Sequence, residues 1–399
     1  MKPLTLARRI AAALSIIPMS VAFAAQGGAA QGGSTPTPLS QASTQTSTSP
    51  AVDDLSQFFH SSILFMRTNW RAFDSSSDTV LYRVKPSGDN VVPLTPVTYH
   101  VDYRGGSWSP TGGSVVYERD PQATSEPSQL FVVDRQGSGA HQITTGSGVH
   151  TQEAWGPRAT IAFITTDSGA YCLAAVRADG THQRILFCPP HESGLRDFYV
   201  MSTPQWTPSG KSVLVDVGAY EANLEPRWFS RVYRVSVGTG TAVKLTEQVF
   251  GDPDTGGDAQ TLAIAPDGKH GVYAKETSPD GALQLIDLTT GTRTPLAVHG
   301  QTPLYSKDGS KIAFIQHMAT SPYSSRVFVM GANGDNPQPA MANPDPEAYY
   351  TVADWSQDGT RLLVNKVAND RLLQIVNLAT GAATTVTKGT SFKDDWYQP

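Results

Sequence analysis

The stretch Trp108-Ser-Pro-Thr-Gly-Gly-Ser-Val-Val-Tyr-Glu118 sets the pattern of the chain, because versions of it return as far as the C-terminus. It reads as the end of one β-strand, a turn rich in Pro and Gly, and a strand of β-branched and aromatic residues. Together these predict a hairpin. Trp206–Val215 is a clear copy and Trp155–Ile164 a degenerate one. Weaker copies are Ala265–Lys269, Tyr305–Phe314 and Trp355–Val364.

The anchor residues that open these copies stand at positions 108, 155, 206, 264, 305, 355 and 396, so they follow one another at intervals of 41 to 58 residues. This is the length of a four-stranded propeller blade. A second strand phrase, such as Leu130–Asp134 or Leu283–Asp287, lies downstream of the anchors. A turn containing Gly, such as Arg177–Gly180, and a short strand complete the unit. The repeats therefore predict an all-β propeller in which each sheet packs on both faces.

The repeated phrases resemble the C-terminal propeller of the TolB family over roughly residues 62 to 399. The resemblance rests on the serial recurrence of Pro-Asp-Gly-Lys turns such as Pro266–Lys269, of Ile-Ala-Phe at Ile312–Phe314, and of apolar strands such as Val327–Met330. It implies a propeller whose central channel opens in a funnel. TolB also has an N-terminal α/β domain, for which this sequence shows no pattern. We therefore expect a TolB-type propeller without that domain.

Two incomplete units at the ends of the repeat region predict how the ring closes. The first unit, from Ile63–Met66 through Val91–Thr95, has no preceding anchor strand, and Phe392–Tyr397 is an anchor strand with nothing after it. The two would complete one blade and remove the open sheet edges. The expected fold is thus a seven-bladed β-propeller closed by a C-terminal strand that completes the first blade. Six blades, typical of TolB itself, are the alternative.

The N-terminus predicts export. Lys2, Arg8 and Arg9 precede the apolar run Ile10–Ala22, and Ala22–Ala24 fits a signal-peptidase site, so residues 1–25 are expected to be a signal peptide. The apolar run is shorter than the roughly 20 residues that span a membrane. The arginine pair leaves a twin-arginine route as an alternative. We expect a periplasmic or secreted protein with no membrane span after cleavage.

Residues 26–60 are expected to be a disordered linker, and residues 61–399 the propeller. Gln, Gly, Ser, Thr, Ala and Pro dominate the linker and cannot bury enough surface to offset the entropy of ordering. With a net charge of -5 and 16% charged residues, the chain is not expected to bind nucleic acid. We expect a monomer.

The two cysteines, Cys172 and Cys188, flank one predicted hairpin with its turn at Ala178–Gly180. Counting back from the turn sets Cys172 opposite residue 187, and one bulge residue would set it opposite Cys188. An oxidising compartment favours bridging such a pair. We expect a disulfide that fastens this hairpin, with two independent buried thiols as the alternative.

Motifs for chemistry are mostly missing from the sequence. It has no Gly-x-Ser-x-Gly elbow, no segment after the propeller that would predict a hydrolase domain, no phosphate-binding Gly-rich loop and no cysteine-based zinc spacing. Asp252–Asp258 resembles a calcium loop, but Ala263 stands where the last acidic ligand belongs. An ordinary Asp/Gly turn is the favoured interpretation. No catalytic residue, cofactor or metal ligand is assigned, although calcium or another divalent metal stays open.

Polar residues that lead into the anchor strands are the candidate binding residues, since the TolB resemblance implies that this region lines the funnel. They are Asp102, Tyr103, His150, Asp258, His299, Tyr349 and Tyr350. Converging histidines could hold a divalent metal, as in the seven-bladed oligogalacturonate lyases. Exposed histidines, or histidines bonded to backbone carbonyls, are the alternative.

These observations favour an exported propeller that serves as a protein- or ligand-binding interaction module of the cell envelope. An envelope protein or peptide is the expected partner. The alternative function is an enzyme acting on a saccharide or peptide in the central channel, and a third possibility is a structural envelope component.

Overall fold

The computed structural model describes residues 62–71, 76–190, 195–221, 227–250, 262–275, 281–318, 321–389 and 396–397. The chain divides into two units, Met1–Phe59 and His60–Pro399, and all described residues belong to the second. The predicted signal peptide, the linker and the turn Asp252–Asp258 lie outside the described residues. Within the described part, no helix has the length and apolar character needed to cross a membrane.

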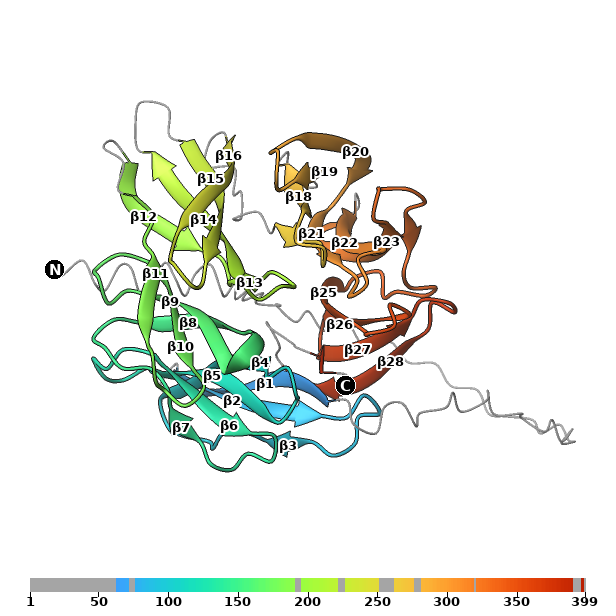
Figure 1. Cartoon of the computed structure of the whole chain (residues 1–399). Helices are drawn as coiled ribbons and strands as arrows, with labels where there is room; N and C mark the ends of the chain where they lie inside the picture. The colour runs from blue at the N-terminus through green and yellow to red at the C-terminus, as the bar shows by residue number, and fades with distance from the viewer. Residues whose placement is uncertain are drawn as a thin grey trace, which may run out of the picture. The chain divides into compact units, whose positions relative to one another are not determined.

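The fold is an all-β propeller in which short antiparallel sheets follow one another along the chain (Figure 1). The N-terminal sheet has eight strands in the order β29-β1-β2-β4-β5-β6-β7, with β3 paired to β2. Its strands are β1 (Ser62–Arg71), β2 (Ser76–Val84), β3 (Val92–Pro93), β4 (Val101–Trp108), β5 (Ser114–Pro121), β6 (Gln129–Asp134), β7 (His141–Gln142) and β29 (Trp396–Tyr397).

Five further sheets of four or five strands complete the described part (Figure 1). The first contains β8 (His150–Trp155), β9 (Thr160–Thr165), β10 (Cys172–Arg177) and β11 (Arg184–Phe187), with the short 3-10 helix η2 (Pro157–Ala159) before β9. The second contains β12 (Leu195–Met201), β13 (Gln205–Trp206), β14 (Ser212–Glu221), β15 (Arg227–Ser236) and β16 (Ala242–Phe250).

The third of these sheets contains β17 (Ala263–Ile264), β18 (His270–Lys275), β19 (Ala282–Asp287) and β20 (Arg293–His299). The fourth contains β21 (Gln301–Tyr305), β22 (Lys311–Met318), β23 (Ser321–Gly331) and β24 (Gln338–Pro339). The fifth contains β25 (Tyr349–Trp355), β26 (Arg361–Val367), β27 (Arg371–Asn377) and β28 (Ala383–Lys388).

The core lies between consecutive sheets, because alternate side chains of a strand point to opposite faces. In β9, Ile161 and Phe163 pack toward the N-terminal sheet, whereas Ala162 and Ile164 pack toward the sheet that contains β14. The side chains of β22 alternate in the same way. Phe314 packs in a cluster with residues of β18, whereas its neighbours Ala313 and Ile315 pack in a cluster with residues of β26. The hydrophobic runs after each anchor turn therefore supply apolar side chains to both faces of each sheet.

The repeated anchor residues and turns also link one sheet to the next. The Trp206 indole N–H donates to the Ala154 carbonyl at 3.0 Å, and the Trp355 indole N–H donates to the Leu304 carbonyl at 3.1 Å. In the turns, a Cβ at Gly210 would lie 2.1 Å from Pro157 of the preceding copy. The anchor motif therefore recurs because each copy contacts its neighbour.

A second inter-sheet contact recurs in seven hairpins, which we call the outer hairpins: β2–β3, β6–β7, β10–β11, β15–β16, β19–β20, β23–β24 and β27–β28. Each has a glycine with positive φ in its turn, and this glycine faces the last strand, or the residues just after it, of another outer hairpin: the preceding one in six cases, and the last one of the chain for Gly88. At Gly88, an added Cβ would lie 2.7 Å from the Val386 carbonyl oxygen of β28. The equivalent pairs are Gly137 with Pro93, Gly180 with Ile143, Gly240 with Leu186, Gly291 with Leu245, Gly334 with Leu296, and Gly381 with Ala342.

The C-terminal strand pairs with the first strand. In β29, Trp396 lies opposite Ile63 and Tyr397 opposite Ser62. The predicted closing strand is thus found at these two positions, while residues 390–395 lie outside the described part. Arg67 of β1 adds a contact with the last sheet, since its guanidinium donates to the Lys388 carbonyl at 3.0 Å.

The predicted disulfide between Cys172 and Cys188 is present, with the two Cα atoms 4.3 Å apart. A bulge between Leu173 and Ala174 shifts the register of β10 against β11, so that Leu173 lies opposite Phe187. The bulge residue invoked from the sequence thus explains how the two cysteines come to face each other.

Candidate functional site

The first strands of several sheets are interrupted by a β-bulge shortly before the anchor residue. The register shifts between Arg104 and Ser107 in β4, and between Thr151 and Ala154 in β8. The same shift occurs between Gln301 and Leu304 in β21, and a shorter one between Val352 and Asp354 in β25. Such bulges re-aim side chains and are frequent beside binding sites.

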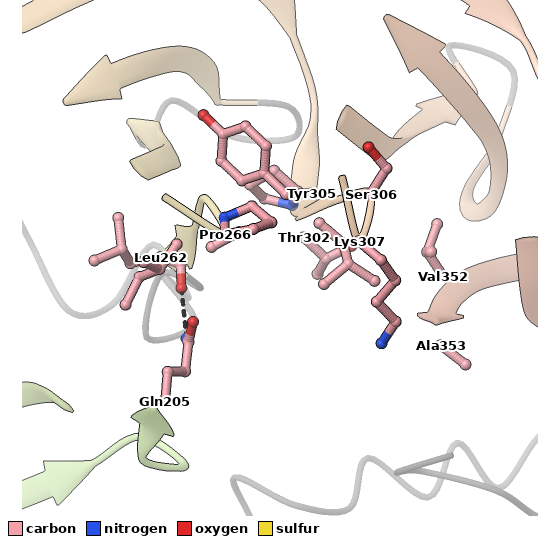
Figure 2. A pocket seen from close by; sticks show the side chains of 13 residues that line it. Gln205, Leu262, Pro266, Thr302, Tyr305, Ser306, Lys307, Val352 and Ala353 are labelled. Atoms are coloured by element: carbon pink, nitrogen blue, oxygen red, sulfur yellow. Dashed lines mark hydrogen bonds between the residues drawn. The ribbon is translucent and has the colours of Figure 1, made fainter. Parts of the chain in front are cut away.

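A cavity of about 490 Å³ lies at the bulges of β21 and β25 (Figure 2). Residues at or beside the first strands of four successive sheets line it: Gln205 from β13, Leu262, Ala263, Ile264 and Pro266 from and around β17, Thr302 to Lys307 from β21 and its turn, and Val352 with Ala353 from β25. The lining is largely apolar, and a few polar groups stand among the apolar side chains. This composition is typical of ligand pockets.

One ion pair stands in the wall of this cavity. Lys307 Nζ lies 2.7 Å from Asp354 Oδ1, with side-chain exposures of 37% and 9%. The same carboxylate oxygen accepts the Trp355 backbone N–H at 2.7 Å. The pair joins the turn after β21 to β25, and its Lys307 side chain lines the cavity.

Thr302 combines two unusual features in the cavity wall. Its φ of 46° lies in the left-handed region, which β-branched residues rarely adopt. Its hydroxyl oxygen is buried and has no hydrogen-bond partner among the described residues. The neighbouring Pro303 supplies no backbone N–H, and both residues fall in the gap of the β21 register. Backbone strain and unpaired buried polar atoms are both more frequent at functional sites than elsewhere.

A second polar cluster surrounds Arg104 in the N-terminal sheet. The guanidinium lies 2.7 Å from Asp102 Oδ2 and 2.8 Å from Asp120 Oδ2. Glu118, which is 7% exposed, accepts the Thr151 hydroxyl at 2.6 Å. Burial, opposed by the charge of Arg104, raises the pKa of Glu118 to about 7. This cluster ties β4 and β5 to β8.

Asp102 and Tyr103, predicted to line the funnel, are both buried in β4. Asp102 accepts the Thr79 backbone N–H at 2.9 Å and also pairs with Arg104. The Tyr103 hydroxyl lies 2.9 Å from the Thr98 hydroxyl, within the cluster of the N-terminal sheet. Both side chains therefore have partners inside the fold, and ligand contact by them stays a prediction.

His150 is fully buried at the start of β8. Its Nε2 lies 2.8 Å from Asp167 Oδ2, and its Nδ1 is buried with no partner among the described residues. Burial lowers the pKa of His150, against the opposing effect of the Asp167 carboxylate. The ring therefore offers a metal no open nitrogen: one is bonded and the other is enclosed.

The remaining candidates are scattered. Tyr350 is 1% exposed, and its hydroxyl accepts the Asp345 backbone N–H at 3.0 Å. Tyr349 is half-buried beside the His317 ring, with centroids 5.8 Å apart. His299 is exposed at the end of β20. Asp258 lies outside the described residues, and none of the six described candidates lines the cavity.

The predicted positions differ from the cavity residues because they stand five or six residues before the anchors, whereas the bulges of β21 and β25 lie two or three residues before them. A signal was present in the sequence: Thr-Pro occurs at the same distance before two anchors, as Thr203–Pro204 and Thr302–Pro303. Among the described residues, no group of three or more His, Cys, Asp or Glu is arranged to hold a metal ion.

Comparison with known proteins supports the fold. No family model matches the chain. A Bacillus subtilis (strain 168) protein described as the uncharacterized peptidase YuxL is 25% identical over 255 residues, which are 60% of this chain and 34% of the relative. The chain therefore spans about a third of the length of that relative.

Three solved structures illustrate the likeness. An oligogalacturonate lyase in complex with manganese has 15% identity, covers 82% of this chain and 84% of its own, and gives a TM-score of 0.57. The propeller domain of the Pyrococcus furiosus Trilobed protease has 12% identity, covers 83% and 95%, and gives 0.58. TolB from Acinetobacter baumannii has 16% identity, covers 84% and 82%, and gives 0.47. The chain is thus a β-propeller structurally similar to the lyase and protease propellers, and likeness at such identities shows the fold alone.

Proposed function

We propose that this protein is an exported binding module of the cell envelope that holds an extended peptide segment in the cavity beside β13, β17, β21 and β25. The observation that carries the proposal is the convergence of four first strands on one largely apolar cavity of about 490 Å³. Interaction modules built on rigid rings present such a site without needing catalytic groups.

The cavity suits a peptide because it combines apolar walls with groups that fix orientation. Leu262, Ile264 and Val352 would contact apolar side chains. The buried Thr302 hydroxyl needs a hydrogen-bond partner, which a peptide amide or carbonyl would supply. Lys307, whose side chain is 37% exposed, would meet a carboxylate at the rim with its ammonium group.

A cavity-filling variant tests the proposal. Ala353→Trp would place an indole in the cavity, whereas Ala379→Trp adds the same side chain at an exposed turn residue. Random peptides displayed on phage should be enriched by the wild-type protein and by Ala379→Trp. Ala353→Trp should lose at least about tenfold in affinity for the enriched peptides, since a few central contacts dominate such binding. Equal binding by all three proteins would remove the cavity from the proposal.

We propose that the propeller has seven blades. The eight-stranded sheet is divided by its one parallel bridge, Thr79 opposite Asp102, into a set β29-β1-β2-β3 and a set β4-β5-β6-β7. The seven outer-hairpin glycines support the count, because each faces the preceding set and Gly88 faces Val386 of the last. We infer that the two sets are separate blades.

Export is proposed from the sequence of residues 1–25. N-terminal sequencing of protein recovered from the periplasm or the medium should begin at or near Ala25. A mature chain that begins at Met1 would contradict the proposed localisation.

The alternative function, an enzyme acting on a saccharide or peptide in the channel, is favoured by one observation: the curated relative is described as a peptidase. The match covers about a third of that relative, and we assign no catalytic residue in this chain. Binding is therefore the function we propose.

A further inference from the structure

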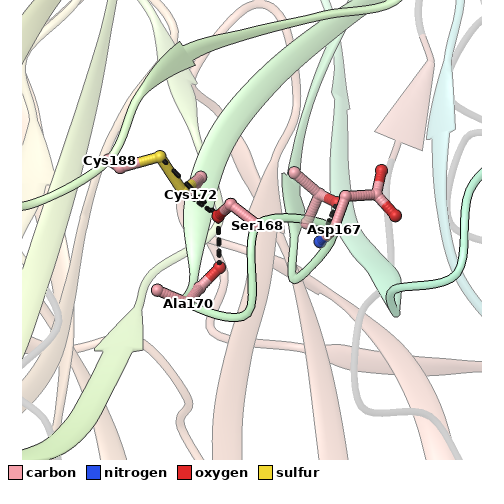
Figure 3. The surroundings of a disulfide bond; sticks show 6 residues. Asp167, Ser168, Ala170, Cys172 and Cys188 are labelled. Atoms are coloured by element: carbon pink, nitrogen blue, oxygen red, sulfur yellow. Dashed lines mark hydrogen bonds between the residues drawn. A yellow bond between two sulfur atoms is a disulfide. The ribbon is translucent and has the colours of Figure 1, made fainter.

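The two cysteines of the Cys172–Cys188 disulfide (Figure 3) differ in their exposure to solvent. Cys172 opens β10 and is fully buried, whereas Cys188 follows β11 and is exposed. Thiol–disulfide exchange requires a thiolate to approach one sulfur while the other leaves, so access decides which sulfur is attacked. Solvent reaches Cys188 in the folded protein.

Ser168 stands beside the buried sulfur, in the loop between β9 and β10. Its Oγ lies 3.0 Å from Cys172 Sγ, 3.9 Å from Cys188 Sγ and 3.3 Å from the Ala170 carbonyl oxygen (Figure 3). Neither sulfur of a disulfide carries a proton, and the hydroxyl has one, which it donates to the Ala170 carbonyl oxygen and can turn toward Cys172 Sγ. A disulfide sulfur is a weak acceptor, but a thiolate is a strong one. The bond from Ser168 would therefore strengthen as charge develops on Cys172.

The carboxylate next to this serine is hydrogen-bonded on the side away from the disulfide. Asp167 accepts the Gly148 backbone N–H at 2.8 Å and lies 2.8 Å from His150 Nε2. Figure 3 shows its carboxylate directed away from the sulfur atoms. Burial alone would raise the pKa of a Cys172 thiol and make it a poor leaving group. The Ser168 hydroxyl opposes this effect.

We propose that the disulfide is a thiol-exchange site of fixed direction, which accepts the thiolate of a small thiol or of a Cys-x-x-Cys protein at Cys188. The incoming sulfur forms a bond to Cys188 Sγ, the Cys172–Cys188 bond breaks, and its electron pair leaves on Cys172 Sγ. Ser168 donates to that thiolate until it takes a proton from solvent. The thiol is oxidised to a mixed disulfide, and Cys172 is reduced.

Trapping the first product tests the direction. The native, oxidised protein is mixed with reduced glutathione or with a Cys-x-x-Ser variant of a dithiol protein, stopped with acid, unfolded and alkylated with a maleimide. Peptide mass spectrometry should find the adduct on Cys188 and the maleimide on Cys172, in at least about tenfold excess over the reverse. Adducts on Cys172, equal amounts of both products, or exchange that requires denaturant would overturn the proposal.

The role of Ser168 has its own test. Ser168→Ala should slow the glutathione reaction about tenfold or more, the effect of one hydrogen bond to a charged group. Ser168→Thr should restore most of the rate, because it keeps the hydroxyl. Ser138→Ala, at an exposed turn of the β6–β7 hairpin, is the matched control and should not change the rate. A Ser168→Ala protein that reacts at the wild-type rate, with an unchanged melting temperature, would refute the assignment of Ser168.

Discussion

At Glu118, burial outweighs the opposing charge of Arg104. Its carboxyl group is enclosed between β5 and β8, close to Arg104 and hydrogen-bonded to Thr151. Its pKa is about 7 in the folded protein and 4.5 ordinarily, so between these pH values the folded state binds more protons than the unfolded state. The free energy of unfolding contributed by Glu118 therefore falls as the pH rises through this window.

Glu118→Gln should remove that dependence. Relative to wild type, the variant should gain up to about 3 kcal/mol in stability between pH 4 and pH 8, the equivalent of the pKa shift. Urea unfolding of both proteins at the two pH values measures the difference. An identical stability difference at pH 4 and pH 8 would mean that Glu118 titrates normally in the fold.

The bulges explain why candidate residues were harder to predict than strands. Side chains of a strand alternate between its faces, and an extra residue changes which face the following positions occupy. Tyr103 and Tyr350 precede bulges and are buried inside the fold, whereas Thr302 lies within one and faces the cavity. Gly105–Gly106 and Thr302–Pro303 mark two of these bulges in the sequence, but neither pair indicates a cavity until the neighbouring sheets are placed.

At the scale of elements, turns and strands followed directly from the sequence. The Pro, Asp and Gly turns after each anchor predict the hairpins, and the apolar runs predict strands packed on both faces, as β9 and β22 show. The disulfide was predictable because two cysteines flank one short hairpin. The contacts that the outer-hairpin glycines make with neighbouring sheets were not predictable, because a turn favours glycine for its positive φ whether or not another sheet lies against it.

A comparison of two glycines distinguishes the effect of a positive φ from the effect of close contact between sheets. Gly88 and Gly139 both have positive φ, but an added Cβ would lie 2.7 Å from the Val386 carbonyl oxygen at Gly88 and would meet nothing within 4 Å at Gly139. Gly139→Ala should lower the free energy of unfolding by about 1 kcal/mol through backbone strain. Gly88→Ala should lower it by roughly 2–4 kcal/mol, since the clash adds to the strain.

Chemical denaturation of the two variants and the wild type measures both effects. Equal losses of stability at the two sites would show that the contact between Gly88 and β28 contributes nothing, and would weaken the evidence for a closed series of seven.

At the scale of the whole molecule, two contacts join the first strand to the end of the chain. β29 pairs with Ser62 and Ile63 of β1. Independently, Arg67 of β1 donates to the Lys388 carbonyl at 3.0 Å and to the Thr387 hydroxyl at 2.8 Å. If both contacts hold one closed ring, each should depend on the other, because removing either one frees the edge of the first sheet.

A double-mutant cycle tests this dependence. Deleting residues 396–399 removes β29 and should lower the melting temperature and promote aggregation, by exposing the edge of β1. Arg67→Ala alone should destabilise the protein by about 1–3 kcal/mol, the range for hydrogen bonds made by a charged group. In the truncated protein the same substitution should cost clearly less, because the first sheet is already detached from the last. Contacts that act as a unit depart from additivity by about 0.5 kcal/mol or more, whereas independent ones add. Strict additivity across the four proteins would mean that the ends of the chain meet without closing the ring.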